Sequence, residues 1–108
     1  MTSHPQLDQG KTSRSFTGES IGAGVSIILV DVAPGKGPRL HRHKYEEVFV
    51  LQEGAATFTR GDESVEVRPG DVVVVQPGTP HRFEATGSER LRLVAIHHAT
   101  DFETEWLE

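Results

Sequence analysis

Hydrophobic residues along this chain come in short runs separated by turn-forming residues. The runs cover residues 25–32, 48–51, 72–75, 82–85 and 91–97. Between them stand segments rich in Gly and Pro, such as residues 34–38 and 76–80. Short β-branched and aromatic runs bounded by such residues are typical of strands joined by tight turns. The pattern therefore predicts an antiparallel all-β chain with little helix.

The two ends of the chain differ from this central pattern. Residues 1–20 are polar and rich in Ser, Thr and Gly, which predicts a flexible N-terminal arm or an edge strand. Residues 21–108 then form one barrel domain, because 108 residues leave no room for a second core. Within that domain, residues 101–108 are expected to form a helical turn or an edge segment.

Charge and composition limit the kinds of molecule that the protein is expected to bind. The chain has 11 basic and 16 acidic residues, a formal net charge of −5, and no long basic run. This balance argues against general affinity for nucleic acids or anionic membranes and favours a small-molecule substrate or ligand. Cysteine is absent, which excludes disulfides and thiolate ligands, and no apolar run approaches the length of a membrane span. We expect a cytoplasmic protein.

Four side chains with metal-binding chemistry lie in two sequence blocks. The first contains His41, His43 and Glu47, and the second contains His81. His41 and His43 are two residues apart, so in a strand both imidazoles lie on one face. Glu47 begins the next apolar run, and a hairpin-like bend before it would return its carboxylate towards them. His81 follows the turn at 76–80. Three neutral imidazoles and one carboxylate suit one divalent transition-metal ion, and Fe, Mn, Ni, Zn and Cu remain open.

The spacing of these residues resembles the two sequence motifs of the cupin superfamily. The first motif is matched in full by Gly35, His41, His43, Glu47 and Gly54. The second is matched at Gly70, Gly78 and His81, whereas Gln76 stands where Pro is usual and Ala85 where Asn is usual. The likeness to a small single-domain cupin implies a double-stranded β-helix, a jelly-roll-like barrel whose mouth holds the ion. Two other interpretations of the four side chains are a polar barrel mouth without metal and a closed structural zinc site.

Further positions follow from alternation and from the resemblance. Phe49 and Phe83 are two residues beyond Glu47 and His81, so both should face the barrel interior as pocket walls or as core. Only one residue of the pair His97 and His98 can face inward, and the cupin pattern favours His97. It would act either as a general acid or base or as a structural neighbour of the ligands. Three arginines are candidates for binding a substrate carboxylate or are simply exposed: Arg39, Arg82 and Arg92.

The resulting functional hypothesis is a metal-dependent enzyme. An ion with four protein ligands keeps open positions for a substrate, so the sequence favours Fe(II) oxygenase-like (dioxygenase) activity on a small oxygenated organic molecule. The alternatives are a non-redox isomerase or decarboxylase and a non-catalytic binding or sensing cupin. Similar single-domain cupins are often dimers, and we predict a homodimer in which the N-terminal segment covers a sheet edge.

Overall fold

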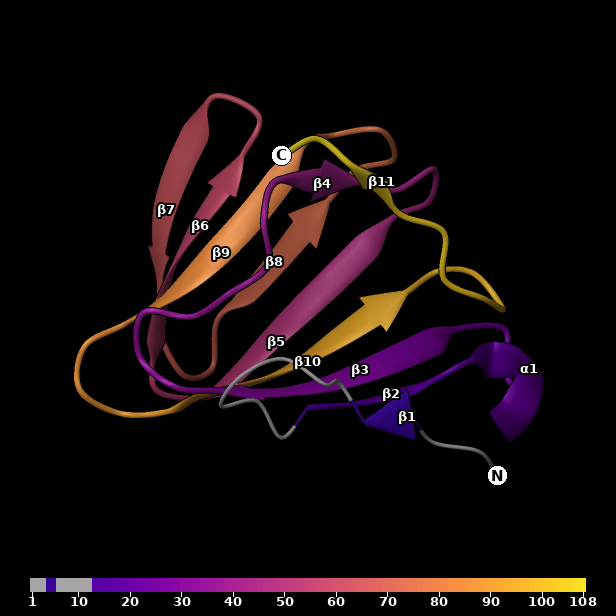
Figure 1. Cartoon of the computed structure of the whole chain (residues 1–108), viewed down its shortest axis with the longest axis horizontal. Helices are drawn as coiled ribbons and strands as arrows, with labels where there is room; N and C mark the ends of the chain where they lie inside the picture. The colour runs from indigo at the N-terminus through magenta and orange to yellow at the C-terminus, as the bar shows by residue number, and fades with distance from the viewer. Residues whose placement is uncertain (1–3, 6–12) are drawn as a thin grey trace.

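The fold is two antiparallel sheets that face each other, as seen in a computed structural model that describes residues 4–5 and 13–108 (Figure 1). The first sheet, sheet A, runs β1 (His4–Pro5), β2 (Arg14–Phe16), β3 (Ser26–Val32), β10 (Leu91–His97), β5 (Glu47–Glu53) and β8 (Val72–Val75). The second, sheet B, runs β11 (Glu105–Trp106), β4 (His41–Arg42), β9 (His81–Thr86), β6 (Ala55–Arg60) and β7 (Glu63–Val67). The predicted all-β class and jelly-roll-like barrel are confirmed.

Sheet A is organised around a strand that comes late in the chain. β10 pairs with β3 along its whole length, from Leu91 opposite Val32 to His97 opposite Ser26. On its other side it pairs with β5, so that His97 lies opposite Glu47. β10 therefore joins two parts of sheet A that are otherwise not bonded to each other.

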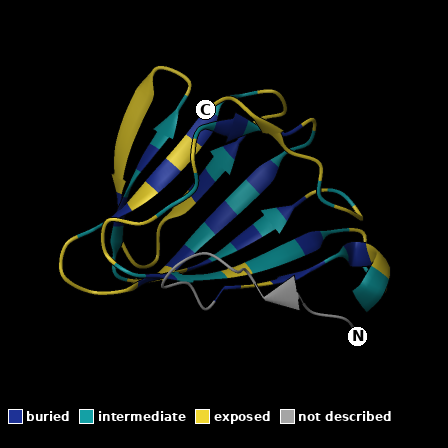
Figure 2. Ribbon diagram, in the orientation of Figure 1, coloured by how far each residue is buried: buried dark blue, intermediate teal, exposed yellow. Residues whose placement is uncertain are grey.

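The core lies between the sheets because the strands alternate as predicted. On β9, on β10 and on β5 as far as Leu51, every second residue is buried, and the residues between them are partly or fully exposed (Figure 2). Three aromatic rings fill the middle, with centroids of Phe49 and Phe58 4.9 Å apart and those of Phe58 and Phe83 5.0 Å apart. The remaining core side chains are mostly Val, Leu and Ala from both sheets.

The two ends of the chain add short elements. The predicted arm of residues 1–20 lies partly outside the described residues, and within it β2 pairs with β3 while residues 18–21 form the one-turn helix α1 (Gly18–Ile21). The sequence analysis missed this helix, which begins where the Thr17 hydroxyl accepts a hydrogen bond from the Ser20 N–H at 3.2 Å. At the other end β11 pairs with β4, so residues 105–106 form an edge segment rather than a helical turn. No helix among the described residues is long and apolar enough to span a membrane.

Candidate metal centre

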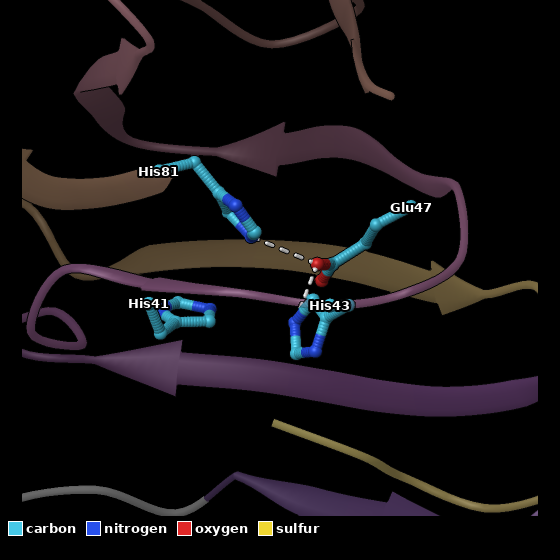
Figure 3. A group of neighbouring side chains, drawn as sticks. All are labelled: His41, His43, Glu47 and His81. Carbon is cyan, nitrogen blue, oxygen red and sulfur yellow. Dashed lines mark hydrogen bonds and ion pairs between the residues drawn. The ribbon is translucent and has the colours of Figure 1, made fainter. Parts of the chain in front are cut away.

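The four candidate ligands lie together in one cluster of side chains (Figure 3). His41 lies on β4 and His81 begins β9, and the two are direct partners across those strands. His43 follows β4, and Glu47 begins β5. All four side chains are buried, and one ligand atom from each lies within 4.8 Å of every other. The structure therefore brings both sequence blocks into one cluster that could hold a metal ion.

A backbone hydrogen bond links the turn before His81 to the segment that carries His43. The Gly78 N–H donates to the His43 carbonyl oxygen at 2.7 Å. Gly78 has a φ of +81°, a conformation that glycine adopts without the steric penalty of a side chain. The tight turn before His81 is thus fixed directly against the segment that carries His43. This explains why a glycine is needed three residues before the fourth candidate ligand.

Main-chain carbonyl groups hold the three imidazole rings in place. Each ring directs Nδ1 at a carbonyl oxygen, and the pairs are His41 with Arg39 at 2.7 Å, His43 with Glu103 at 2.7 Å, and His81 with Thr79 at 2.9 Å. Because a carbonyl oxygen only accepts, Nδ1 must carry the proton in each neutral ring. Nε2 then presents its lone pair to the cluster, which is the tautomer of a histidine that binds a metal through Nε2.

Two of the three Nε2 atoms, those of His43 and His81, lie against the carboxylate of Glu47. His81 Nε2 lies 3.0 Å and His43 Nε2 lies 3.1 Å from Glu47 Oε1. His43 Nε2 is buried and has no hydrogen-bond partner among the described residues. Lone pairs on nitrogen and carboxylate oxygen repel each other unless a proton or a cation lies between them. The donor set, three imidazoles and one carboxylate, fits a divalent transition metal.

Burial and neighbouring charges set the protonation of the cluster. Burial lowers the pKa of His41 to about 4, so this ring is neutral at neutral pH, as a metal ligand must be. Burial would raise the pKa of Glu47, but the neighbouring imidazoles of His43, His81 and His97 hold it well below its usual range. At His43, burial lowers the pKa, whereas the Glu47 carboxylate and the Glu103 carbonyl raise it by more. Glu47 is therefore the stable negative charge of the site.

A fourth imidazole and a tyrosine stand beside the cluster. His97 is buried with its side chain facing inward, whereas His98 is exposed. His97 Nε2 lies 3.0 Å from Glu47 Oε2, and its Nδ1 lies 2.8 Å from the Tyr45 hydroxyl. Burial raises the pKa of Tyr45 to about 12, which keeps this hydroxyl protonated. Sequence reasoning missed Tyr45, although its position between His43 and Glu47 places it beside both blocks.

A cavity of about 600 Å³ opens from the cluster and runs between the sheets. His41, His43, Glu47 and His97 line its polar end. Its apolar walls include the predicted Phe49 and Phe83, which also belong to the core, together with the residues Ile28, Val30, Val32, Ala95, Phe102 and Trp106.

Two basic side chains, Lys36 and Arg39, line the same cavity. The Arg39 guanidinium lies 5.1 Å from the centroid of the Trp106 ring, at the range of a cation–π contact. The other two arginines considered from the sequence are not in the lining. Arg82 lies 3.8 Å from Glu108, and Arg92 lies 3.8 Å from Glu53.

The chain belongs to the cupin family, because the family model described as "Cupin domain" matches residues 28–97. A protein of Methanocaldococcus jannaschii named "Uncharacterized protein MJ1618" is 31% identical over 104 residues, which cover 92% of this chain and 83% of that protein. Mannose-1-phosphate guanylyltransferase RfbM of Salmonella typhimurium is 28% identical over 81 residues. That match covers 73% of this chain but only 17% of the guanylyltransferase.

Solved structures with this fold include oxalate decarboxylases. The enzyme of Bacillus subtilis at pH 4.6 is 25% identical, with a TM-score of 0.86 over 97% of this chain and 30% of that one. A second structure of that enzyme, from work on its Mn(II) centres, has the same identity and coverage and a TM-score of 0.87. The enzyme of Lactobacillus farciminis, bound to formate, is 19% identical with a TM-score of 0.87, covering 96% of this chain and 33% of that one. The chain thus spans about a third of these relatives.

Proposed function

We propose that this cupin binds one divalent transition-metal ion through His41, His43, Glu47 and His81 and uses it to catalyse a reaction of a small organic acid. The observation that carries the proposal is that ligand atoms of three imidazoles and one buried carboxylate lie within 4.8 Å of one another, with every Nδ1 of the three rings held by a carbonyl group. When bound, such a cation supplies a Lewis acid that polarises a substrate carbonyl group.

The cavity supports an organic anion as the substrate class. Lys36 and Arg39 are the cationic side chains in its lining, and Glu47 is the only acidic one among the described lining residues. Neither cation forms an ion pair with a described residue, so both are available to a substrate carboxylate. The apolar walls suit the carbon body of the molecule. A volume of about 600 Å³ accepts a compound much larger than oxalate.

Decarboxylation is the reaction that we favour at this site. The structural similarity to oxalate decarboxylases supports it, and so does the contact between Tyr45 and His97, because the reaction needs a proton. In a 3-oxo acid, the bond between carbon and the carboxylate breaks and CO₂ leaves. The electron pair moves towards the carbonyl oxygen, and a proton held by His97 Nε2 replaces the carboxyl group on carbon. Tyr45 then supports His97 by hydrogen bonding to Nδ1.

Oxygenase activity is the second candidate. The donor set of the cluster suits Fe(II) as well as Mn(II), which keeps the oxygenase prediction from the sequence open. Dioxygenase activity, a role for His97 in catalysis and a cytoplasmic location all remain predictions.

One experiment separates the candidates. The protein, purified without a metal-affinity tag, is analysed for bound metals, then stripped and loaded without oxygen with Mn(II) or Fe(II). It is next incubated with 2-oxo and 3-oxo acids while CO₂ release and O₂ uptake are recorded together. We expect near-stoichiometric metal, and CO₂ release from the Mn(II) protein that needs no O₂.

The other outcomes are equally informative. O₂ uptake that depends on substrate would replace the decarboxylase with an oxygenase. Saturable ligand binding without turnover under either metal would assign a binding role. A protein that binds none of these metals would refute the metal centre itself.

A further inference from the structure

Residues 101–108, which we call the C-terminal strap, follow β10 and return alongside β4. In Figure 1 this is the yellow segment that passes beside β4 as β11. The pairing is short, with Glu105 opposite Arg42 and Trp106 opposite His41. The strap therefore lies directly beside the strand that carries the first candidate ligand.

Few contacts hold the strap against the barrel. Every residue in it is exposed except Phe102, which is partly buried. Thr104 lines both the cavity of about 600 Å³ and a second cavity of about 370 Å³. The strap thus has open space on two sides and buries little apolar surface. Segments of this kind open at a lower free energy than the core strands.

The strap supplies one wall of the cavity that we assign to the substrate. Phe102, Thr104 and Trp106, which are alternate residues, line that cavity. The ring of Phe102 contacts the ring of His97 edge to face, with centroids 4.9 Å apart. The ring of Trp106 packs against that of His41, with centroids 5.1 Å apart. Docking of the strap is therefore needed to complete the cavity.

The same strap holds one of the candidate ligands. His43 Nδ1 donates to the main-chain carbonyl oxygen of Glu103 at 2.7 Å, and Thr104 Oγ1 lies 3.3 Å from the same nitrogen. For His41 and His81, the carbonyl group comes from the residue two positions earlier in the sequence. Of the three rings, only that of His43 depends on a segment that is distant in the sequence.

An ion pair fixes the strap next to that contact. The Arg42 guanidinium donates to both carboxylate oxygens of Glu105, at 3.0 and 2.9 Å. Such a two-point contact fixes the relative orientation of the two groups. The hydrogen bond from Arg42 lowers the pKa of Glu105, and the charge of Lys44 adds to that effect. Glu105 is two residues from Glu103, so the ion pair also places the carbonyl group that holds His43.

We propose that the C-terminal strap positions His43 in the metal centre, and that Arg42 and Glu105 are the pair that docks the strap. Docking then completes the metal centre and the cavity wall in one step. An undocked strap leaves His43 Nδ1 without its acceptor, so the ring is free to turn or to change its tautomer. The centre then loses one well-oriented donor. The inference rests on the proposed metal centre but not on the proposed reaction.

The coupling must act in both directions. If a docked strap raises the affinity for the metal, a bound ion must stabilise docking by the same factor. The Leu107 amide reports docking, because its N–H donates to the Leu40 carbonyl oxygen at 2.9 Å. Hydrogen exchange at this amide should slow at least about tenfold when Zn(II) is added to the wild type. The Asp71 amide, which donates to the Arg68 carbonyl in a turn outside the strap, should change much less.

The main variant reverses the charge of Glu105. Glu105→Lys places a cation beside Arg42 and should undock the strap. Glu63→Lys is the matched control, because Glu63 is similarly exposed and forms an ion pair with Arg60 at 3.3 Å. Zn(II) titration of the stripped proteins against a competing chelator should show the Kd of E105K raised at least about tenfold, as for other groups that orient a metal ligand. E63K should match the wild type.

A charge-swapped double variant separates docking from long-range electrostatic effects. R42E/E105K restores an ion pair and keeps the net charge of the wild type, so it should recover most of the lost affinity. The ¹⁵N chemical shifts of the His43 ring provide a readout in the metal-free proteins, at a pH where the ring is neutral. The wild type and the double variant should show Nδ1 protonated, whereas E105K should show a mixture of tautomers.

Wild-type values of both the Kd and the His43 shifts in E105K would overturn the proposal. Equal loss of affinity in E105K and E63K, or no recovery in the double variant, would overturn it as well. The exchange experiment needs no variant, so an unchanged Leu107 rate in the metal-bound wild type is decisive even if E105K does not fold. A wild type that binds no metal would refute the metal centre, and the metal-free His43 shifts would still decide whether the strap positions the ring.

Discussion

The barrel interior has a polar half and an apolar half, and the same strands contribute side chains to both. Along β5 the inward residues change from Glu47 to Phe49 and then to Leu51. Along β9 they change from His81 to Phe83. In each strand the polar residue lies in the candidate metal centre, and the aromatic residue that follows it both lines the cavity and belongs to the core. Both halves are buried to a similar extent, so burial alone does not distinguish core from site.

The halves differ in what satisfies the buried groups. In the apolar half, ring packing and removal of surface from water provide the stability. In the polar half, each imidazole needs a hydrogen-bond partner at Nδ1, and the Nε2 atoms of His43 and His81 face the Glu47 carboxylate. Taking such groups out of water is unfavourable unless they are paired. The comparison indicates that the apolar half carries the fold and the polar half carries the chemistry.

The largest effect is expected from removing a ring at the centre of the apolar half. Phe58 is 1% exposed and its ring contacts those of Phe49 and Phe83. Phe58→Ala should lower the free energy of unfolding by about 3–5 kcal/mol, because it removes buried surface and leaves a cavity. Urea unfolding followed by circular dichroism measures this, with the exposed Val65→Ala as the control. A loss below about 1 kcal/mol would show that the apolar half does not carry the fold.

The polar half should make the metal-free protein sensitive to acid. Burial lowers the pKa of His41 from 6.5 to about 4, so the unfolded chain binds more protons between these pH values. Stability should therefore fall as pH drops from about 6.5 to 4, by at most about 3.4 kcal/mol at 1.36 kcal/mol per pKa unit. The lowered pKa of Glu47 extends this loss to lower pH, while the raised pKa of His43 opposes it.

Thermal unfolding of the metal-free protein at several pH values from 7 to 4 measures this sensitivity. His41→Ala should have a flatter profile than the wild type. An identical slope in the two proteins would assign the acid sensitivity to other groups.

A third test removes a ligand without touching the apolar half. His41→Ala should weaken metal binding at least tenfold, or about 1.4 kcal/mol, because one of four donors is lost. His98→Ala is the matched control, since His98 is exposed and outside the cluster. Titration of the stripped proteins with Mn(II) or Zn(II) against a competing chelator measures both. Unchanged affinity in His41→Ala would contradict the assignment of the ligands.

The smallest effect is expected beside the cluster. Tyr45→Phe removes the hydroxyl that lies 2.8 Å from His97 Nδ1 and should cost about 1 kcal/mol of stability. It should also change the ¹⁵N chemical shifts of the His97 ring, because the tautomer is no longer fixed. Shifts that match those of the wild type would mean that Tyr45 does not position His97. Metal content should stay the same, since Tyr45 is not among the four donors.

The sequence predicted the strands and the cluster because both depend on spacing. Alternation places Phe49 two residues beyond Glu47 on the same face, and the structure has both buried on β5. His41 and His81 were expected to meet from their motif positions, and they are strand partners. The sequence could not predict the groups that hold the rings, because a main-chain carbonyl can come from any residue. Glu103, whose carbonyl holds His43 Nδ1, is 60 residues away in the chain.

The side of β8 that faces the core was also beyond the sequence analysis. The run Val72–Val75 has no alternation, so its pattern could not distinguish an inner from an outer face. Only the structure shows that Val73 and Val75 face the core, whereas Val72 and Val74 face outward beside Val50 and Val48 of β5.

The place of β10 in sheet A has a consequence for how quickly the chain can fold. Residues 91–97 must insert between β3 and β5, which lie about 65 and 45 residues earlier in the chain. Neither half of sheet A can complete its strand pairing before residues 91–97 are in place. Hairpins that form early are therefore only weakly stabilised. Folding should then be slow and all-or-none, on the millisecond to second scale of proteins with mostly non-local pairings.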